Sequence, residues 1–267
     1  MKGDFYLEYY DNILRKVAKW RVVEAKLLYT LSEYQGTNRS FNRVLSNLEK
    51  TKLLKSTHLR GKSKFLYASP ELNTIYKINT PLIQEESLVH ESIITTVTNK
   101  MLEWSAFESA TLPHELISAK NFYVNNLMPD SVLHGRQDGD LFNLALEVEL
   151  SRKSKIRVAK KLQDYLANQV FDHIFYIFND RGTFEGYKRM LDSFIANSNE
   201  VKGKEASVRV LLGYYPSLYS NDFDLDLLEV YHLGKITNLQ SVFGTKKLKG
   251  MSHRSPTDVL SVKKELQ

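Results

Sequence analysis

Along its first 80 residues the chain shows a helical spacing of apolar positions and then the alternation of a hairpin. The predicted helices cover residues 7–20, 22–34 and 39–54, and the predicted strands cover 53–59 and 64–69. Residues 60–62, which are Arg, Gly and Lys, form the expected turn between the two strands. The pattern therefore predicts a compact N-terminal module that spans residues 1–80.

After a polar connector at residues 76–87, strands begin to alternate with helices. The predicted elements are a helix at 88–107, strands at 121–135 and 141–151, a helix at about 151–170, a strand at 173–179, a helix at 183–198 and a strand at 206–215. This order predicts a second domain over residues 81–243, of the α/β class, with a mixed sheet flanked by helices. Residues 244–267 form a basic tail, poor in large apolar residues, that we expect to be flexible.

The third predicted helix has one apolar face and one polar face. The apolar positions are Phe41, Val44, Leu45 and Leu48, and the polar positions include Arg43, Asn47 and Lys50. Three helices followed by a basic-tipped hairpin resemble a winged helix, in which the third helix enters a DNA groove and the wing contacts phosphate. We expect base contacts from Arg43 and Asn47, and phosphate contacts from Lys50, Arg60 and Lys62. The alternative is a solvated helix face on a module that packs against another protein.

Composition excludes several classes of protein and permits a polyanionic partner. Of 267 residues, 37 are Lys or Arg and 31 are Asp or Glu, which gives a net charge of +6. Because cysteine is absent, disulfides and thiolate metal sites are excluded. No apolar run approaches the roughly 20 residues of a membrane helix, and the N-terminus lacks a signal-peptide pattern. We therefore expect a cytoplasmic protein without membrane insertion.

The segment LALEVELSRKS, residues 144–154, places two acids on one face of a predicted strand. Leu144, Leu146, Val148 and Leu150 alternate onto the core face, and Glu147 and Glu149 alternate onto the other face. Since two neighbouring carboxylates repel each other, a divalent cation such as Mg²⁺ or Mn²⁺ is expected between them. Asp130 lies a hairpin's length upstream and can approach Glu147, and Pro129 before it predicts a strand irregularity.

The helix after this strand is predicted to have a basic face. The basic positions are Lys153, Arg157, Lys160 and Lys161, and the positions expected to face inward are Ile156, Ala159, Leu162 and Leu166. A lysine beside a metal-bound water can orient that water or stabilise charge on a phosphate. Arg157 and Lys161 are also candidates for contact with DNA phosphates.

Pro129-Asp130, then Glu147-Val148-Glu149, then Lys153 resemble the PD-(D/E)XK nuclease superfamily. That family usually has a lysine where this chain has Glu149, so Lys153, Lys160 or Lys161 must substitute. Residues 144–157, LALEVELSRKSKIR, are similar to the signature of the MobC class of plasmid relaxases, whose replication-relaxation relatives also join a winged helix to this core. Glu91, in the sequence Leu-Val-His-Glu that opens the helix at residue 88, also looks like the family and is a candidate metal or water ligand.

The resemblance implies a relaxase or mobilisation protein that nicks DNA at a plasmid transfer origin with Mg²⁺ or Mn²⁺. Its catalytic residues would be Asp130, Glu147, Glu149, Lys153 and Glu91, and its metal ligands would be Asp130, Glu147 and Glu149. Its partners would be double-stranded DNA, single-stranded near the nick, and other relaxosome or mobilisation proteins. Three alternatives stay open: a non-catalytic DNA-binding accessory factor or regulator on a degenerate nuclease core, a defence or repair endonuclease, and a protein-interaction module with surface acids. A covalent step through a tyrosine is also open, with Tyr165, Tyr29 and Tyr34 as candidates.

Overall fold

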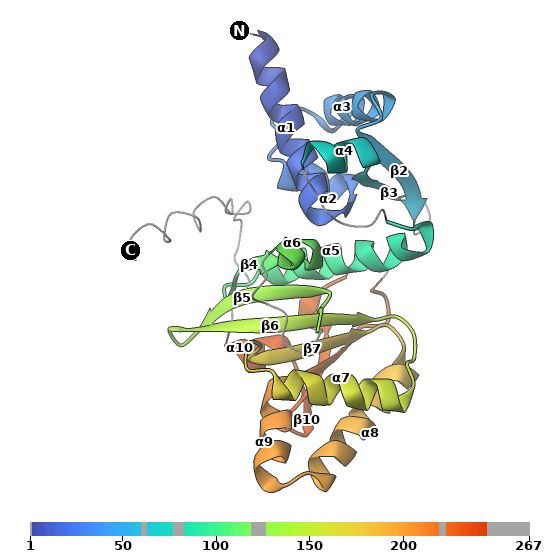
Figure 1. The fold of residues 1–267 in the computed structure, drawn as a ribbon. Helices are drawn as coiled ribbons and strands as arrows, with labels where there is room; N and C mark the ends of the chain where they lie inside the picture. Colours follow the sequence, from blue (N-terminus) through green and yellow to red (C-terminus); the bar gives the residue numbers. More distant parts are fainter. Residues whose placement is uncertain (1, 60–62, 77–82, 119–126, 219–222, 245–267) are drawn as a thin grey trace.

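The N-terminal module combines helices with a small antiparallel sheet (Figure 1). The computed structural model describes residues 2–59, 63–76, 83–118, 127–218 and 223–244. The elements of the module are α1 (Lys2–Trp20), β1 (Val22–Glu24), α2 (Ala25–Leu31), α3 (Asn38–Lys50), β2 (Leu54–Leu59), β3 (Ser63–Ala68) and α4 (Pro70–Ile75). Its strands lie in the order β1-β3-β2. The predicted turn at residues 60–62 lies outside the described residues.

The single helix predicted at 22–34 is wrong, because its first residues form β1. Val22 and Val23 are β-branched, and they pair with Tyr67 and Leu66 of β3. Arg21 has a positive φ of 61°, which separates the end of α1 from this strand. Local helical spacing in the sequence was therefore overridden by a pairing with residues more than 40 positions away.

Helix α3 has the two faces that its sequence predicts. Phe41, Val44, Leu45 and Leu48 are buried, and Arg43, Asn47 and Lys50 are exposed. The side chain of Thr37 caps the helix by accepting the N–H of Ser40. Lys64 of β3 donates to Glu49 at 2.7 Å, which ties the hairpin to the end of this helix.

The second part of the chain is a mixed sheet of seven strands, which confirms the α/β class. Its order is β10-β9-β8-β7-β6-β5-β4, and β6, β7 and β8 run parallel while the other pairs are antiparallel. The helices are η1 (Glu85–Ser87), α5 (Leu88–Leu102), α6 (Pro113–Ser118), α7 (Lys155–Ala167), α8 (Arg181–Asn197), α9 (Glu200–Arg209), η2 (Leu225–Leu227) and α10 (Leu239–Phe243). The strands are β4 (Phe107–Thr111), β5 (Ser131–Gln137), β6 (Asp140–Glu149), β7 (His173–Phe178), β8 (Val210–Tyr214), β9 (Glu229–His232) and β10 (Lys235–Thr237).

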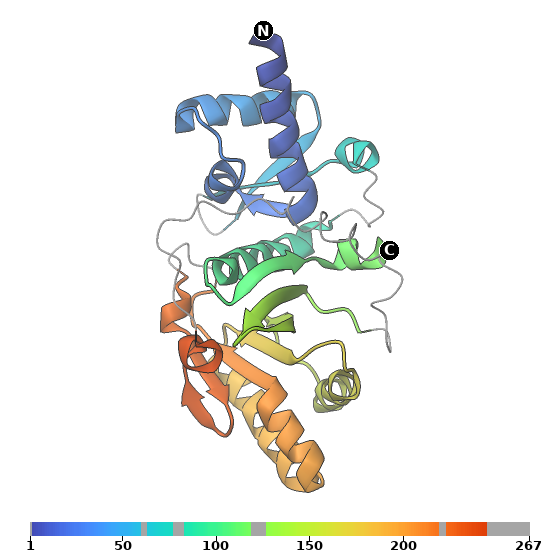
Figure 2. The same ribbon diagram turned by 90° about the vertical axis from the view of Figure 1, so that its left-hand side faces the viewer.

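Helices cover both faces of the large sheet (Figures 1 and 2). Leu144, Leu146 and Val148 of β6 belong to the core on the α5 side, and Ala145 belongs to the core beneath α7 and α8. By strand alternation, Glu147 and Glu149 point to the α7 and α8 side, and both are buried there. None of the described helices is both long enough and apolar enough to pass through a membrane.

One apolar core continues from the N-terminal module into the sheet by way of α5. Val17 and Leu66 of the module share this core with Ile93 and Val97 of α5 and with residues of the sheet. The buried Thr95 hydroxyl donates to the carbonyl of Trp20 at 3.1 Å. Figure 2 shows α5 between the module and the sheet. The expected boundary at residue 80 and the tail from 245 lie outside the described residues.

Candidate functional site

Asp130 lies where β5 ends beside β6. Because Ser131 pairs with Leu146 in antiparallel register, Pro129 falls opposite Val148 two residues farther along. Proline has no N–H to donate, so it cannot continue the ladder. The carboxylate of Asp130 accepts the N–H of Val148 at 2.7 Å instead. Asp130 therefore takes the place of a strand carbonyl as the acceptor for Val148, and this position puts its carboxyl beside Glu147.

His90 completes the same strand edge from the opposite face of the sheet. Its Nε2 donates to the carbonyl of Val148 at 2.9 Å and lies 3.6 Å from Oδ2 of Asp130. Both polar groups of the Val148 backbone are thus satisfied by side chains. Burial raises the pKa of Asp130, while the nearby His90 and the Val148 N–H oppose that rise.

Glu147 is a buried carboxyl with two hydrogen-bond partners on α7. Lys161 donates from Nζ to Oε2 at 2.5 Å, and the hydroxyl of Tyr165 donates to Oε1. Burial, with Asp130 as the next cause, raises the pKa of Glu147 to about 8, although Lys161 and Tyr165 act to lower it. Burial and the neighbouring Asp130 therefore favour the protonated form of Glu147.

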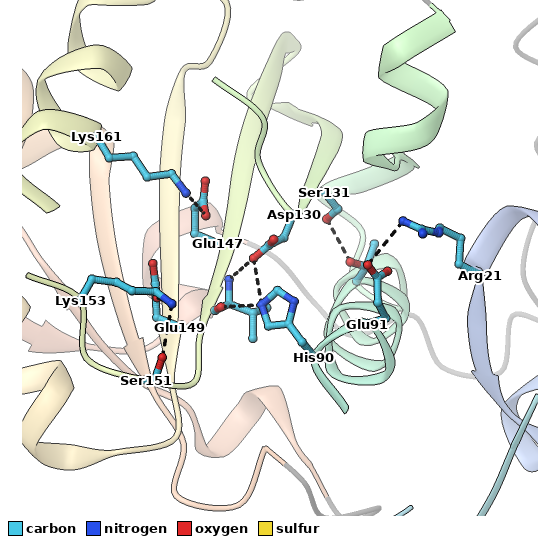
Figure 3. Close-up of polar contacts among 12 residues, drawn as sticks. Arg21, His90, Glu91, Asp130, Ser131, Glu147, Glu149, Ser151, Lys153 and Lys161 are labelled. Carbon is cyan, nitrogen blue, oxygen red and sulfur yellow. Dashed lines mark hydrogen bonds and ion pairs between the residues drawn. The ribbon is translucent and has the colours of Figure 1, made fainter. Parts of the chain in front are cut away.

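Glu149 lies one pleat farther along β6, nearer to solvent than Glu147. Lys153 approaches it with Nζ at 3.8 Å from Oε2, and the hydroxyl of Tyr187 hydrogen bonds to it. Burial raises the pKa of Glu149, and the charge of Lys153 opposes that rise. Figure 3 shows Asp130, Glu147 and Glu149 with the two lysines and His90 around them. The acids predicted from the sequence are therefore brought together, with Lys161 beside Glu147, Lys153 beside Glu149 and the imidazole of His90 beside Asp130.

Glu91 is turned toward the junction with the N-terminal module rather than toward the glutamates of β6. Its Oε1 lies 3.4 Å from a guanidinium nitrogen of Arg21, which is the residue with positive φ before β1. Burial raises the pKa of Glu91, and the charge of Arg21 opposes the rise. In this arrangement Glu91 links the two parts of the chain, and Figure 3 shows it on α5 turned toward Arg21.

Three buried tyrosine side chains surround the two glutamates. Tyr165 and Tyr187 donate to Glu147 and Glu149, and Tyr176 stands on β7 in register with Glu147. The buried hydroxyl of Tyr176 has no hydrogen-bond partner among the described residues. Tyr165 itself is fully buried, so its hydroxyl faces the carboxylate rather than solvent. Tyr29 donates to the carbonyl of Gly36 at 2.7 Å, and Tyr34 packs on Phe41.

Arg209 of α9 fixes the end of α7 that carries Tyr165. Its guanidinium donates to the carbonyls of Asn168 and Phe171, both at 2.6 Å, and to the carbonyl of Tyr165 at 3.2 Å. Glu205 supplies the counter-charge. A buried arginine saturated in this way holds the backbone of α7 against the sheet and so orients Tyr165 toward Glu147.

The donor chemistry of the acidic cluster matches a hard divalent cation. Mg²⁺ is commonly held by one or two carboxylates together with waters and substrate phosphate, which Asp130 and Glu147 can supply. Within the described ranges, no group of three or more His, Asp or Glu side chains stands ready to surround an ion. The ammonium groups of Lys161 and Lys153 lie against the carboxylates instead. In this arrangement the two glutamates are paired with lysines, and the described side chains do not enclose a cation.

The residues expected to contact DNA fall into three groups. Arg43, Asn47 and Lys50 lie on the exposed face of α3, and Arg157 is exposed on α7. Lys161 is bound to Glu147, so it belongs to the acidic cluster in this structure. Arg60 and Lys62 lie outside the described residues.

Reasoning from the sequence did not find His90, Tyr176 or Tyr187 as neighbours of the acids. Tyr165 and Lys161 are four residues apart, a helical spacing that would place both on one face of α7. The other three come from α5, β7 and α8, and only the topology of the sheet brings them to β6.

No protein-family model matches this chain, and no curated protein matches it. Among solved structures, it is similar to TrmBL2, an archaeal chromatin protein whose structure shows a novel mode of DNA binding. The identity is 14%, the match covers 84% of this chain and 76% of that chain, and the TM-score is 0.21. A TM-score of this size does not establish a common fold.

Proposed function

We propose that this chain is a DNA-processing protein that nicks DNA with the help of Mg²⁺ or Mn²⁺. In this proposal the N-terminal module is a winged helix, the second part is a PD-(D/E)XK nuclease core, and the protein is a relaxase or mobilisation protein of the MobC class. The observation that carries the proposal is the position of Asp130 beside Glu147 across β5 and β6, with Glu149 and two lysines around them.

The proposed roles follow from these contacts. Asp130 and Glu147 would bind the cation, and Glu149 would be the third acid of the site. A bound cation supplies polarisation of the scissile phosphate and a lower pKa for an attacking water. Lys161, displaced from Glu147, and Lys153, half-buried beside Glu149, would offset the charge that develops on the phosphate.

The proposed DNA contact of the N-terminal module uses the exposed face of α3. Arg43 and Asn47 are side chains of the kinds that read base edges, and Lys50 is suited to phosphate. Arg60 and Lys62 would contact phosphate from the wing. Under this proposal, the slope of log K for DNA binding against log salt concentration is proportional to the number of phosphate contacts. Each lysine or arginine that is replaced lowers the magnitude of this slope by about 1.

The test is nicking of a supercoiled plasmid that carries the transfer origin, with Mg²⁺, with Mn²⁺ and with EDTA. Asp130→Asn and Glu147→Gln replace a carboxyl that can ionise to hold a cation by a neutral amide of similar shape, and the Asn oxygen can still accept the Val148 N–H. We expect site-specific nicking in the wild type, its loss with EDTA, and at least a hundredfold slower nicking, about 3 kcal/mol of barrier, in both variants. Asp140→Asn, an exposed acid at the other end of β6, is the matched control and should nick normally.

A non-catalytic DNA-binding accessory factor is the second candidate. It is favoured by the saturation of Glu147 by Lys161 and Tyr165, and by the structural use of Asp130 at the end of β5. Binding of origin DNA without nicking under any metal condition would select this candidate. Cleavage of DNA that lacks an origin would instead select a defence or repair endonuclease, and absence of DNA binding at low salt would refute all three.

A further inference from the structure

The segment that enters α7 is the most basic stretch next to the acidic cluster. Residues 151–161, SRKSKIRVAKK, contain six basic residues and no acidic one. Lys153 and Lys161 are directed at the glutamates. The other four, Arg152, Lys155, Arg157 and Lys160, are exposed and form no ion pair with any residue that the structure describes. This surface is therefore complementary in charge to a polyanion.

Ile156 lies in the middle of this basic surface and is 84% exposed, more than any other large apolar side chain that the structure describes. The expectation that Ile156 faces inward is wrong. Val158, Leu162 and Tyr165 form the buried stripe of α7, at i, i+4 and i+7, and Ile156 is about a third of a turn away from Leu162. Packing among the residues that the structure describes thus does not account for a large aliphatic side chain at this position.

The exposed side chain of Ile156 lies close in the chain to the acidic cluster. It follows Lys153 by three residues in the chain, and the Nζ of Lys153 lies 3.8 Å from Glu149. A DNA strand with a phosphate at the acids would pass the first turn of α7, where exposed arginine and lysine side chains surround Ile156. Apolar side chains set among basic ones enter DNA between base pairs and unstack them.

We propose that Ile156 is a wedge that inserts between base pairs of duplex DNA beside the acidic cluster and opens the step that is to be cut. The proposal rests on the proposed function, because it requires this face to meet DNA. The cost of unstacking, a few kcal/mol per step, would be offset by contacts of the surrounding basic side chains with the two separated strands. The wedge would give the acids access to one strand of the duplex.

The test measures unwinding of DNA without cleavage. A relaxed closed plasmid is incubated with the protein and a metal-independent type IB topoisomerase in EDTA, so that metal-dependent nicking is silent. After removal of protein, each inserted wedge leaves the plasmid negatively supercoiled. We expect a change in linking number that rises with occupancy in the wild type, and its loss in Ile156→Ala at equal occupancy measured by fluorescence anisotropy.

Leu141→Ala is the matched control, since Leu141 is 70% exposed but lies at the opposite end of β6 from the glutamates. It should unwind DNA like the wild type, and Ile156→Leu should retain the effect. In Mg²⁺, nicking of closed duplex by Ile156→Ala should fall about tenfold or more, equivalent to about 1.4 kcal/mol. Nicking of a duplex with a mismatched step at the cut should stay within about twofold of the wild type, because that step is already open.

Wild-type binding without a change in linking number would overturn the wedge, as would an unchanged effect in Ile156→Ala. Either result leaves the nicking activity standing, so failure of the wedge is distinct from failure of the proposed function. Absence of DNA binding overturns both. Loss of binding to phosphatidylserine vesicles in Ile156→Ala, with DNA unwinding intact, would assign this surface to a membrane and also overturn the wedge.

Discussion

At the scale of single residues, burial raises the pKa of the Glu147 carboxyl group. Its two hydrogen-bond partners, Lys161 and Tyr165, stabilise the charged form, but desolvation and Asp130 outweigh them and set its pKa at about 8. The carboxyl therefore keeps its proton in the folded chain at pH values where the unfolded chain, with an ordinary pKa of 4.5, has lost it.

This difference predicts how stability depends on pH. Between the unfolded pKa of 4.5 and the folded pKa of about 8, the folded state binds more protons, so the free energy of unfolding falls as pH rises. We expect Glu147 to contribute a loss of about 1 kcal/mol per pH unit across pH 6–8. In Glu147→Gln that contribution is absent, so its urea unfolding curves should depend less on pH. Parallel dependences in the two proteins would show that Glu147 is ionised when folded.

The identity of the acids could be predicted from the sequence, but not their environment. Strand alternation placed Glu147 and Glu149 on one face of β6, and a hairpin brought Asp130 to them. The tyrosines and His90 that satisfy these groups come from elements whose order in space is set by long-range pairing, which local spacing does not encode.

At the scale of elements, the hydrogen-bond ladder between β5 and β6 stops at Pro129, and side chains supply the missing hydrogen bonds. Pro129 has no N–H to donate to the carbonyl of Val148, which accepts from His90 instead. The N–H of Val148 donates to the carboxylate of Asp130. The proline was expected to mark an irregular strand, and the structure shows which hydrogen bonds the irregularity releases.

The repair predicts different effects for two substitutions at Asp130. Asp130→Asn retains an acceptor for the Val148 N–H, and its free energy of unfolding should stay within about 1 kcal/mol of the wild type. Asp130→Ala leaves that N–H unsatisfied and should cost about 1–3 kcal/mol, measured by urea unfolding at pH 7. Equal stability of the two variants would mean that water satisfies Val148 and that the contact is not structural.

Several elements followed the sequence closely, and others did not. The strand at 173–179 and the helix at 183–198 match β7 and α8 within two residues, because long periodic segments leave few alternatives. The strand predicted at 206–215 begins only at Val210, since α9 occupies the residues before it. In α7, Val158 rather than Ile156 is buried, because the sheet beneath the helix selects which apolar positions are covered.

At the scale of the whole molecule, α5 joins the two parts into one core. Trp20 in the N-terminal module and Trp104 beside β4 are both buried in that core, and they are the two tryptophans of the chain. A core that is shared in this way is expected to unfold as a unit, although two separate sheets are present.

Single-tryptophan variants test that expectation. Trp20→Phe leaves a probe in the second part, and Trp104→Phe leaves a probe in the N-terminal module. After correction for the stability of each variant by far-UV circular dichroism, each fluorescence transition in urea should coincide with the loss of secondary structure. A fluorescence midpoint displaced from the dichroism midpoint in either variant would show that the two parts unfold independently.

The shared core also has a geometric consequence for DNA. Because packed side chains of α5 set the separation between the exposed face of α3 and the acidic cluster, that separation is a fixed length of the molecule. Under the proposed function the protein would act as a ruler. The cut would fall a constant number of base pairs from the sequence that the first module reads, and moving that sequence along a plasmid would move the cut by the same amount.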